Sequence, residues 1–209
     1  MSMHAWRRGR WRAPTAAALV CLAGVGVVLA AREPAVSRRD ADAFERKVIE
    51  IRQYGSAPLQ GSRVTPVSES EVNSFLRYTA ASEIPAGVRE PSVTMLDGSR
   101  VSGRALVDLD AAREARGRGA FDPMNLVGGQ LEVAADGRLL VEDGRARFDL
   151  ETATVGGVPI PKAVLQELVA YYTRSPEYPA GLDIDDAFEL PARIREIHVR
   201  RGQAVVVQR

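Results

Sequence analysis

Cysteine is nearly absent from this chain of 209 residues, in which Cys21 is the single example. Because Cys21 lies inside an uncharged apolar run, the rest of the chain has no thiol. The sequence therefore excludes a disulfide, a thiol nucleophile and a thiolate metal site beyond residue 21. Val20 stands where a lipoprotein signal has a small residue, so we expect no lipidation. We expect the packed core alone to stabilise the fold.

Histidine is almost as scarce, with only His4 and His198. His4 falls in the N-terminal segment, which leaves His198 alone for the remainder of the chain. A general base needs an oriented partner, and the sequence has neither a Gly-x-Ser-x-Gly elbow nor an acidic or histidine cluster at metal-ligand spacing. We expect His198 on the solvent side of a strand. We also expect no catalytic residues, no metal and no other cofactor.

Lysine is the third scarce residue, since only Lys47 and Lys162 occur among 28 basic residues. The excess of arginine indicates a GC-rich coding bias, typical of a bacterial source, and not a phosphate-binding adaptation. Residues 1–30 contain four arginines and no acidic residue, so the remainder has a formal charge of −3. It lacks a basic stripe that could follow a nucleic-acid backbone. We expect no nucleic-acid partner.

The first 31 residues read as a signal peptide or a signal anchor. Thr15–Ala31 is an uncharged apolar run of intermediate length, slightly long for a signal peptide and slightly short for a transmembrane helix. Cleavage near Ala30 and retention in the membrane both remain open. Either way, a basic flank precedes the run, so the chain from Asp40 onward should be extracytoplasmic, in the periplasm or cell envelope. The flank consists of Arg7, Arg8, Arg10 and Arg12.

Residues 32–62 are expected to be a linker and an amphipathic helix, and residues 63–209 an α+β domain. The apolar spacing predicts a helix over Asp40–Tyr54, as a spacer from the membrane. Val64–Val67 reads as an edge strand. Ser68 and Glu71 have capping-box spacing at the start of a second helix.

Period-2 patterns from Val88 onward predict antiparallel strands. Turns are expected at Asp97-Gly98, Asp136-Gly137 and Asp143-Gly144. In the strand that follows, the even-numbered side chains from Ala146 to Thr154 should face the core and the odd-numbered ones solvent. A glycine–proline corner should lead into a helix at Pro161–Tyr172 that packs on this strand. A hairpin of Arg193–Val199 and Gln203–Val207 should close the domain.

Two loops carry charge patterns with alternative readings. The stretch around Arg113–Leu126 combines basic and apolar residues and could contact membrane headgroups and acyl chains, but a surface helix capped by Asp110 is the favoured reading. The candidate membrane-contact residues are Arg113, Arg116, Arg118 and Phe121. The acidic run Asp183–Glu189 could hold Ca²⁺, but it lacks EF-hand spacing, and solvated turn residues are favoured.

Three stretches together resemble small bacterial envelope proteins with a half-sized tubular lipid-binding (TULIP-like, BPI-like) fold. They are the capping-box helix from Ser68 to Leu76, the Gly157–Pro161 corner with its helix, and Phe188–Pro191 before the last hairpin. The resemblance covers about Val64–Arg209. It implies a curved antiparallel sheet packed on two or three helices, with acyl chains in the groove.

We therefore expect an exported or membrane-tethered protein that binds a lipid or another apolar ligand between sheet and helices. A non-catalytic scaffolding domain with a closed core is the alternative, because a core stripe and a cavity lining have the same composition. An enzyme ranks last. The membrane, through residues 15–31, is an expected partner, and the sequence identifies no protein partner. The expected ligand lining is Val72, Phe75, Leu76, Val107, Phe148, Leu150, Leu165 and Leu168.

Overall fold

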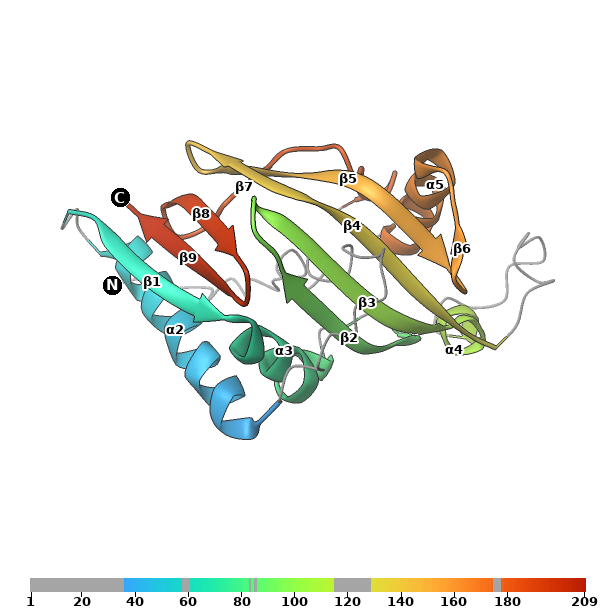
Figure 1. Cartoon of the computed structure of the whole chain (residues 1–209), viewed down its shortest axis with the longest axis horizontal. Helices are drawn as coiled ribbons and strands as arrows, with labels where there is room; N and C mark the ends of the chain where they lie inside the picture. The colour runs from blue at the N-terminus through green and yellow to red at the C-terminus, as the bar shows by residue number, and fades with distance from the viewer. Residues whose placement is uncertain (1–35, 58–60, 83, 85, 115–128, 175–177) are drawn as a thin grey trace, which may run out of the picture.

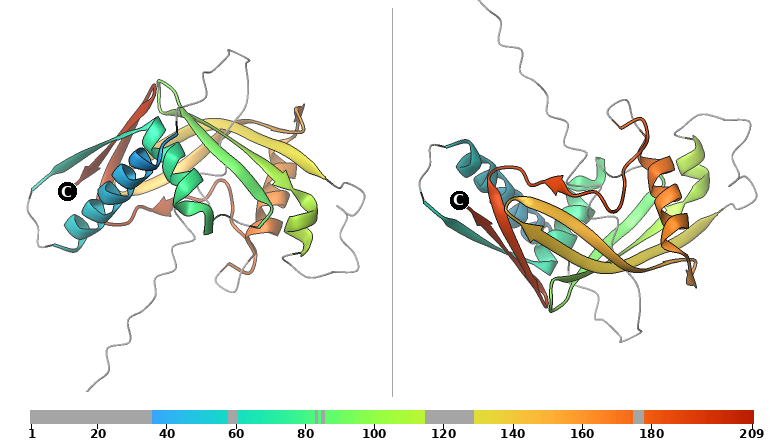
Figure 2. Two further views of the ribbon diagram at one scale, coloured as in Figure 1. Left: turned by 90° about the horizontal axis from the view of Figure 1, so that it is seen from below. Right: turned by 90° about the horizontal axis from the view of Figure 1, so that it is seen from above.

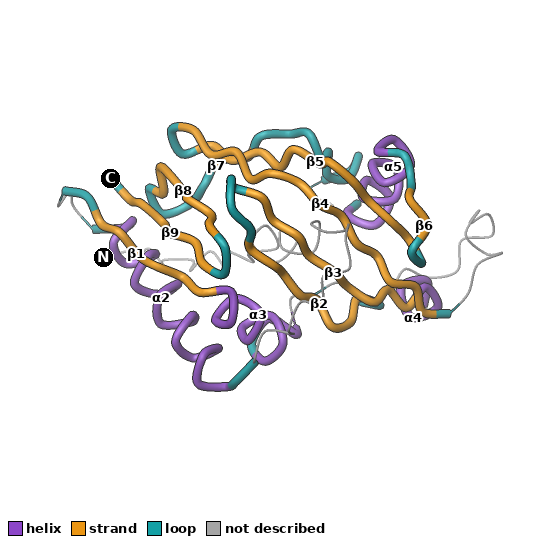
Figure 3. Tube along the Cα trace, viewed as in Figure 1, coloured by secondary structure: helices purple, strands orange, loops and turns teal. Residues whose placement is uncertain are grey.

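A computed structural model describes residues 36–57, 61–82, 84, 86–114, 129–174 and 178–209 of the chain. These residues form an α+β fold of helices and antiparallel sheets (Figure 1), as predicted. The sequence predicted one sheet, whereas the strands divide into two (Figure 3). Across the described ranges, no helix is long and apolar enough to cross a membrane. The apolar run Thr15–Ala31 lies outside those ranges.

The smaller sheet has three strands in the order β1-β9-β8. β1 pairs with β9 along its whole length and lies at the edge, which confirms the predicted edge strand. β8 and β9 form the predicted closing hairpin, turning through Gly202 at a φ of 71°. The strands are β1 (Arg63–Ser68), β8 (Ile194–Arg200) and β9 (Gln203–Gln208).

The larger sheet has the order β2-β3-β4-β5-β6, and β7 also pairs with β5. Asp143 and Gly144 form the predicted tight turn between β4 and β5, and both have a left-handed φ, of 46° and 83°. The Asp97-Gly98 hairpin is also present. The strands are β2 (Val88–Met95), β3 (Arg100–Asp108), β4 (Gln130–Glu142), β5 (Arg145–Val155), β6 (Val158–Pro159) and β7 (Phe188–Glu189).

The predicted turn at Asp136-Gly137 is wrong, because both residues lie inside the long strand β4. Gly137 allows close packing between strands and does not form a turn. A Cβ on this residue would lie 2.5 Å from the Phe148 ring and 2.5 Å from the Asp149 carbonyl oxygen. Asp136 is buried and accepts a hydrogen bond from Thr152 Oγ1 at 3.2 Å. A close approach between β4 and β5 therefore accounts for the glycine.

The predicted alternation along β5 is interrupted in its second half. Ala146, Phe148 and Thr154 are buried as expected, but Thr152 is exposed and Ala153 is buried. The register explains the change, because Gly137 pairs with Leu150 while Asp136 pairs with Thr152, so the β5 ladder passes over Glu151. One extra residue in a strand shifts the alternation at that point, which places Ala153 inside and Thr152 outside.

Two helices pack together beside the smaller sheet, at the opposite end of the molecule from α5 (Figure 2). α2 (Arg38–Ser56) packs on α3 (Glu69–Tyr78), with the rings of Phe44 and Phe75 edge-to-face at a centroid distance of 5.1 Å. α2 is therefore part of the packed domain rather than only a spacer. A short 3-10 helix, η1 (Ala80–Ser82), follows α3.

The predicted capping box at the start of α3 is confirmed. The Ser68 hydroxyl accepts from the Glu71 N–H at 3.2 Å, and the Glu71 carboxylate accepts from the Ser68 N–H at 2.8 Å. Lys47 of α2 adds an ion pair to the same carboxylate at 2.7 Å. One glutamate therefore fixes the start of α3 and joins the two helices.

α5 (Lys162–Thr173) follows the glycine–proline corner as predicted, with Pro161 at its N-cap. Its buried stripe is narrower than expected: Leu165 and Val169 are buried, Leu168 is half-buried and Val164 is 43% exposed. α4 (Leu109–Glu114) is a short helix after β3.

The buried apolar side chains form two clusters. Cluster 1 lies among α2, α3, the smaller sheet and the end of β2, and includes Leu76, Val93 and Val206. Cluster 2 lies between α5 and strands β4 and β5, and includes Phe148 and Leu165. Val101 of β3 packs against both clusters and connects them.

Candidate functional site

Side chains of α3 close the second half of the β2 edge. The buried amide of Asn73 accepts from the Val93 N–H and donates to the Val93 carbonyl, both at 2.7 Å. Glu69 accepts from the Met95 N–H at 2.6 Å, and the Gly202 N–H donates to the Met95 carbonyl at 3.0 Å. The backbone groups of this edge are thus paired, although β2 has a neighbouring strand on one side only.

The first half of β2 has a different conformation. Its pairing with β3 shifts register between Arg89 and Ser92, and Glu90 has a φ of 48°. A left-handed φ is costly for a glutamate, about 1–3 kcal/mol, and bulges of this kind occur often next to functional sites. Pro91 has no N–H to offer a further strand. α3 ends at Tyr78, and residues of its last turn and of η1 line one space with this irregular half of the strand.

A pocket of about 640 Å³ lies between these elements. Its volume is in the range of pockets that hold small organic ligands. The lining mixes aliphatic and charged side chains and comes from three places: the chain just before α2, the end of α3 with η1 and its following turn, and the first half of β2. The lining residues are Val36, Asn73, Leu76, Arg77, Ala81, Ile84, Val88, Arg89, Glu90, Pro91 and Ser92.

The charges of the lining have both signs. Arg77, Arg89 and Glu90 line the pocket, and the Arg89 guanidinium pairs with Asp108 at 3.1 Å. A hydrogen bond from the Ala111 N–H and the nearby Arg89 hold the pKa of Asp108 below its ordinary value, by more than desolvation raises it. The Asp108 carboxylate is therefore a charged partner for Arg89 beside the pocket. The apolar part of the lining can take a hydrocarbon group, and Arg77 can take an anion.

The predicted lining residues do not surround one common space. Phe148, Leu150 and Leu165 belong to cluster 2 or pack against it, whereas the three predicted residues of α3 belong to cluster 1 or pack against it. Val107 and Leu168 are half-buried. Leu76 is the one predicted residue that also lines the pocket. The three α3 residues are Val72, Phe75 and Leu76.

The predicted membrane-contact residues lie largely outside the described ranges. The backbone of Arg113 belongs to α4, but its side chain lies outside the described part of the structure. Arg116, Arg118 and Phe121 fall in residues 115–128, which also lie outside it. The predicted surface helix begins as α4 at Leu109. At its start, the Ala111 N–H donates a hydrogen bond to the carboxylate of Asp108, whereas Asp110 was predicted as the cap.

The other polar motifs have structural partners. His198 is exposed and pairs with Glu196 at 2.9 Å, on the solvent side of β8 as predicted. In the acidic run, Ile184 is buried in cluster 2 and its N–H donates to Gln166 at 2.8 Å. Asp185 forms an ion pair with Lys162. Among the described residues, no three His, Cys, Asp or Glu side chains group as a metal site.

Sequence reasoning missed most of the pocket. The period-2 pattern predicts a regular strand from Val88 and gives no role to Ile84. Pro91 was the sequence signal for the irregular half of β2, because a proline inside a strand pattern marks an edge or a bulge. The position of α3 against that bulge depends on the tertiary fold.

A scan of the chain against models of known protein families finds no match, and neither does a search of curated proteins.

Proposed function

We propose that this protein is an exported or membrane-tethered envelope protein that binds an amphiphilic lipid in the pocket between α3 and β2. The observation that carries the proposal is the pocket of about 640 Å³ between a helix and the irregular half of a sheet edge, with aliphatic and cationic side chains in one lining. The resemblance of Val64–Arg209 to envelope proteins with a curved, lipid-binding sheet supports the same ligand class.

The two parts of the lining match the two parts of an amphiphile. Ile84 and Val88, both half-buried, offer apolar surface for an acyl chain, and the buried Leu76 lies beneath it. Arg77 offers a planar guanidinium for a phosphate or carboxylate. The proposed function is binding of the ligand alone and includes no catalytic step. The N-terminal basic flank and apolar run support the extracytoplasmic, membrane-associated location.

Photocrosslinking tests this function. The full-length chain would be reconstituted in vesicles containing a phosphatidylcholine with a photoactivatable acyl chain, illuminated and mapped by peptide mass spectrometry. We expect labelled peptides within residues 76–92. Val88→Trp should reduce this labelling by filling the pocket, while Val164→Trp on the exposed side of α5 should not. Labelling confined to other parts of the chain would rule the proposal out.

The alternative is a scaffolding domain with a closed core. The burial of Leu165 at 3% exposure and of Leu76 at 2% favours it, because the expected lining residues are largely packed against protein. In that case the pocket would hold only water, and the labelling pattern would not respond to Val88→Trp.

A further inference from the structure

The chain that follows the apolar N-terminal run joins the folded domain at the pocket itself. Val36 is the first described residue and lines the pocket. The next residue is fixed, because the Ser37 N–H donates at 3.0 Å to the hydroxyl of Ser74, which is fully buried in α3. The Ser37 hydroxyl also caps α2 by accepting from the Asp40 N–H at 3.1 Å. Val36 and Ser37 are therefore held beside α3 and the pocket.

The connection between the apolar run and the pocket is short. Only residues 32–35 separate Ala31, the last residue of the run, from Val36. An extended chain advances at most about 3.6 Å per residue, so Ala31 and Val36 are no more than about 18 Å apart. The headgroup layer outside the hydrocarbon core is itself roughly 5–8 Å thick. A membrane-embedded run would thus keep the pocket at the bilayer surface.

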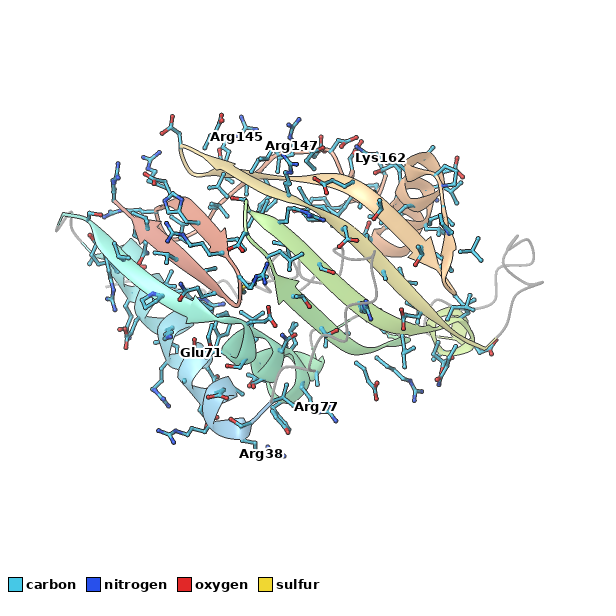
Figure 4. All side chains as sticks on the ribbon, viewed as in Figure 1. Arg38, Glu71, Arg77, Arg145, Arg147 and Lys162 are labelled. Carbon is cyan, nitrogen blue, oxygen red and sulfur yellow. The ribbon has the colours of Figure 1, made fainter. Side chains whose placement is uncertain are left out.

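Two arginines near the pocket can pair with an anionic headgroup, and Glu90 also lies in the lining. Arg38 and Arg77 lie on the lower side of the molecule in Figure 4, whereas Arg145 and Arg147 lie on the upper side. The Arg38 guanidinium lies 5.0 Å from the centre of the Tyr78 ring, which orients it beside the end of α3. Arginine binds phosphate oxygens in a bidentate manner.

Building on the proposed function, we infer that the pocket takes its ligand directly from the bilayer that holds residues 15–31, and that this ligand is an anionic phospholipid. Its phosphate would contact Arg77, and one acyl chain would lie against Ile84 and Val88. The short linker makes capture local, because a tethered site encounters bilayer lipids at a high effective concentration.

A linker insertion tests the local capture. About twelve Gly/Ser residues inserted between Pro34 and Ala35 would make the connection roughly four times as many residues long, and the reach of a flexible linker grows with the square root of that number. Because the bilayer is a plane, the lipid concentration at the site falls roughly in proportion to this reach, so with phosphatidylglycerol carrying a photoactivatable acyl chain we expect labelling of residues 76–92 to fall about twofold. Unchanged labelling would overturn the inference while leaving the proposed function intact. Absence of labelling in the native chain would instead remove the proposed function.

A charge substitution tests the headgroup. Arg77→Gln should reduce labelling by the phosphatidylglycerol probe severalfold but leave labelling by an uncharged diacylglycerol probe with the same acyl chain unchanged. Arg147→Gln is the matched control, because it removes the same charge on the opposite side of the molecule (Figure 4). Equal effects of the two substitutions, or equal losses with both probes, would overturn the assignment of the headgroup to Arg77.

Discussion

The side chain of Asn73 pairs with the backbone of Val93 as a neighbouring strand would. Its oxygen accepts from the Val93 N–H and its nitrogen donates to the Val93 carbonyl, each at 2.7 Å, and the side chain is only 3% exposed. The same nitrogen also donates to the Glu69 carbonyl at 3.0 Å. One amide therefore joins α3 to the edge of the larger sheet and forms one wall of the pocket.

Asn73→Ala should destabilise the fold by about 2–4 kcal/mol. The substitution leaves the Val93 N–H and carbonyl without partners at a buried position, and each unsatisfied group costs roughly 1–3 kcal/mol. Urea unfolding of the full chain in mild detergent measures the change. Gln203→Ala, at an exposed position of β9, is the control and should change the free energy of unfolding by less than about 0.5 kcal/mol. A similarly small change for Asn73→Ala would show that water takes over the hydrogen bonds that the Asn73 amide makes to Val93.

Gly137→Ala should cost roughly 1–3 kcal/mol through overpacking. The new methyl would lie 2.5 Å from the Phe148 ring and 2.5 Å from the Asp149 carbonyl oxygen, and the backbone oxygen cannot turn away. Phe148→Leu should relieve part of the clash, so the double mutant should be more stable than the sum of the two single changes predicts. A double-mutant cycle on the free energy of unfolding measures this coupling. Strict additivity would mean that the ring is not the obstacle.

The Glu71 carboxylate should make stability depend on pH on the acidic side. Burial raises its pKa, but the Lys47 ammonium and hydrogen bonds from Ser68 lower it by more, so its pKa lies below the ordinary value of 4.5. Because the folded pKa is depressed, the stabilisation is complete above the unfolded pKa and is lost as pH falls through the folded value. We expect maximum benefit above about pH 5 and loss below it.

Glu71→Gln tests this dependence, because glutamine can still accept from the Ser68 N–H but cannot attract Lys47. The variant should be less stable than the native chain by about 1 kcal/mol near pH 7, and the difference should disappear in acid. Unfolding free energies measured across this pH range give the slope. The exposed Glu45→Gln on α2 should leave the slope unchanged. A native slope retained in Glu71→Gln would assign the acid sensitivity to another carboxylate.

Local signals predicted local structure well. The Ser68 and Glu71 spacing predicted the start of α3, because the capping box needs only residues within one turn. Asp143-Gly144 predicted a tight turn because both residues tolerate a left-handed φ. Asp136-Gly137 offers the same signal but serves a close contact with Phe148, which lies on the next strand.

The pocket depends on relationships that no local pattern contains. Glu90 and Pro91 interrupt the pairing of β2, and α3 ends opposite them. The division of the expected lining into two clusters follows from the sheet register and from α5 packing on β5 rather than near α3. Period-2 and helical patterns predict which side chains are apolar and facing inward, but not which of them meet.

Tryptophan substitutions should separate packed core from open pocket. Leu165 is 3% exposed within cluster 2, so Leu165→Trp should overpack and cost roughly 1–3 kcal/mol. Val88 is half-buried and faces the pocket, so Val88→Trp should fill free space and leave the free energy of unfolding unchanged or higher. Urea unfolding in lipid-free detergent measures both, and Val164→Trp controls for the larger side chain at an exposed site. Equal destabilisation at Leu165 and Val88 would mean that the pocket closes in solution and that the closed-core alternative holds.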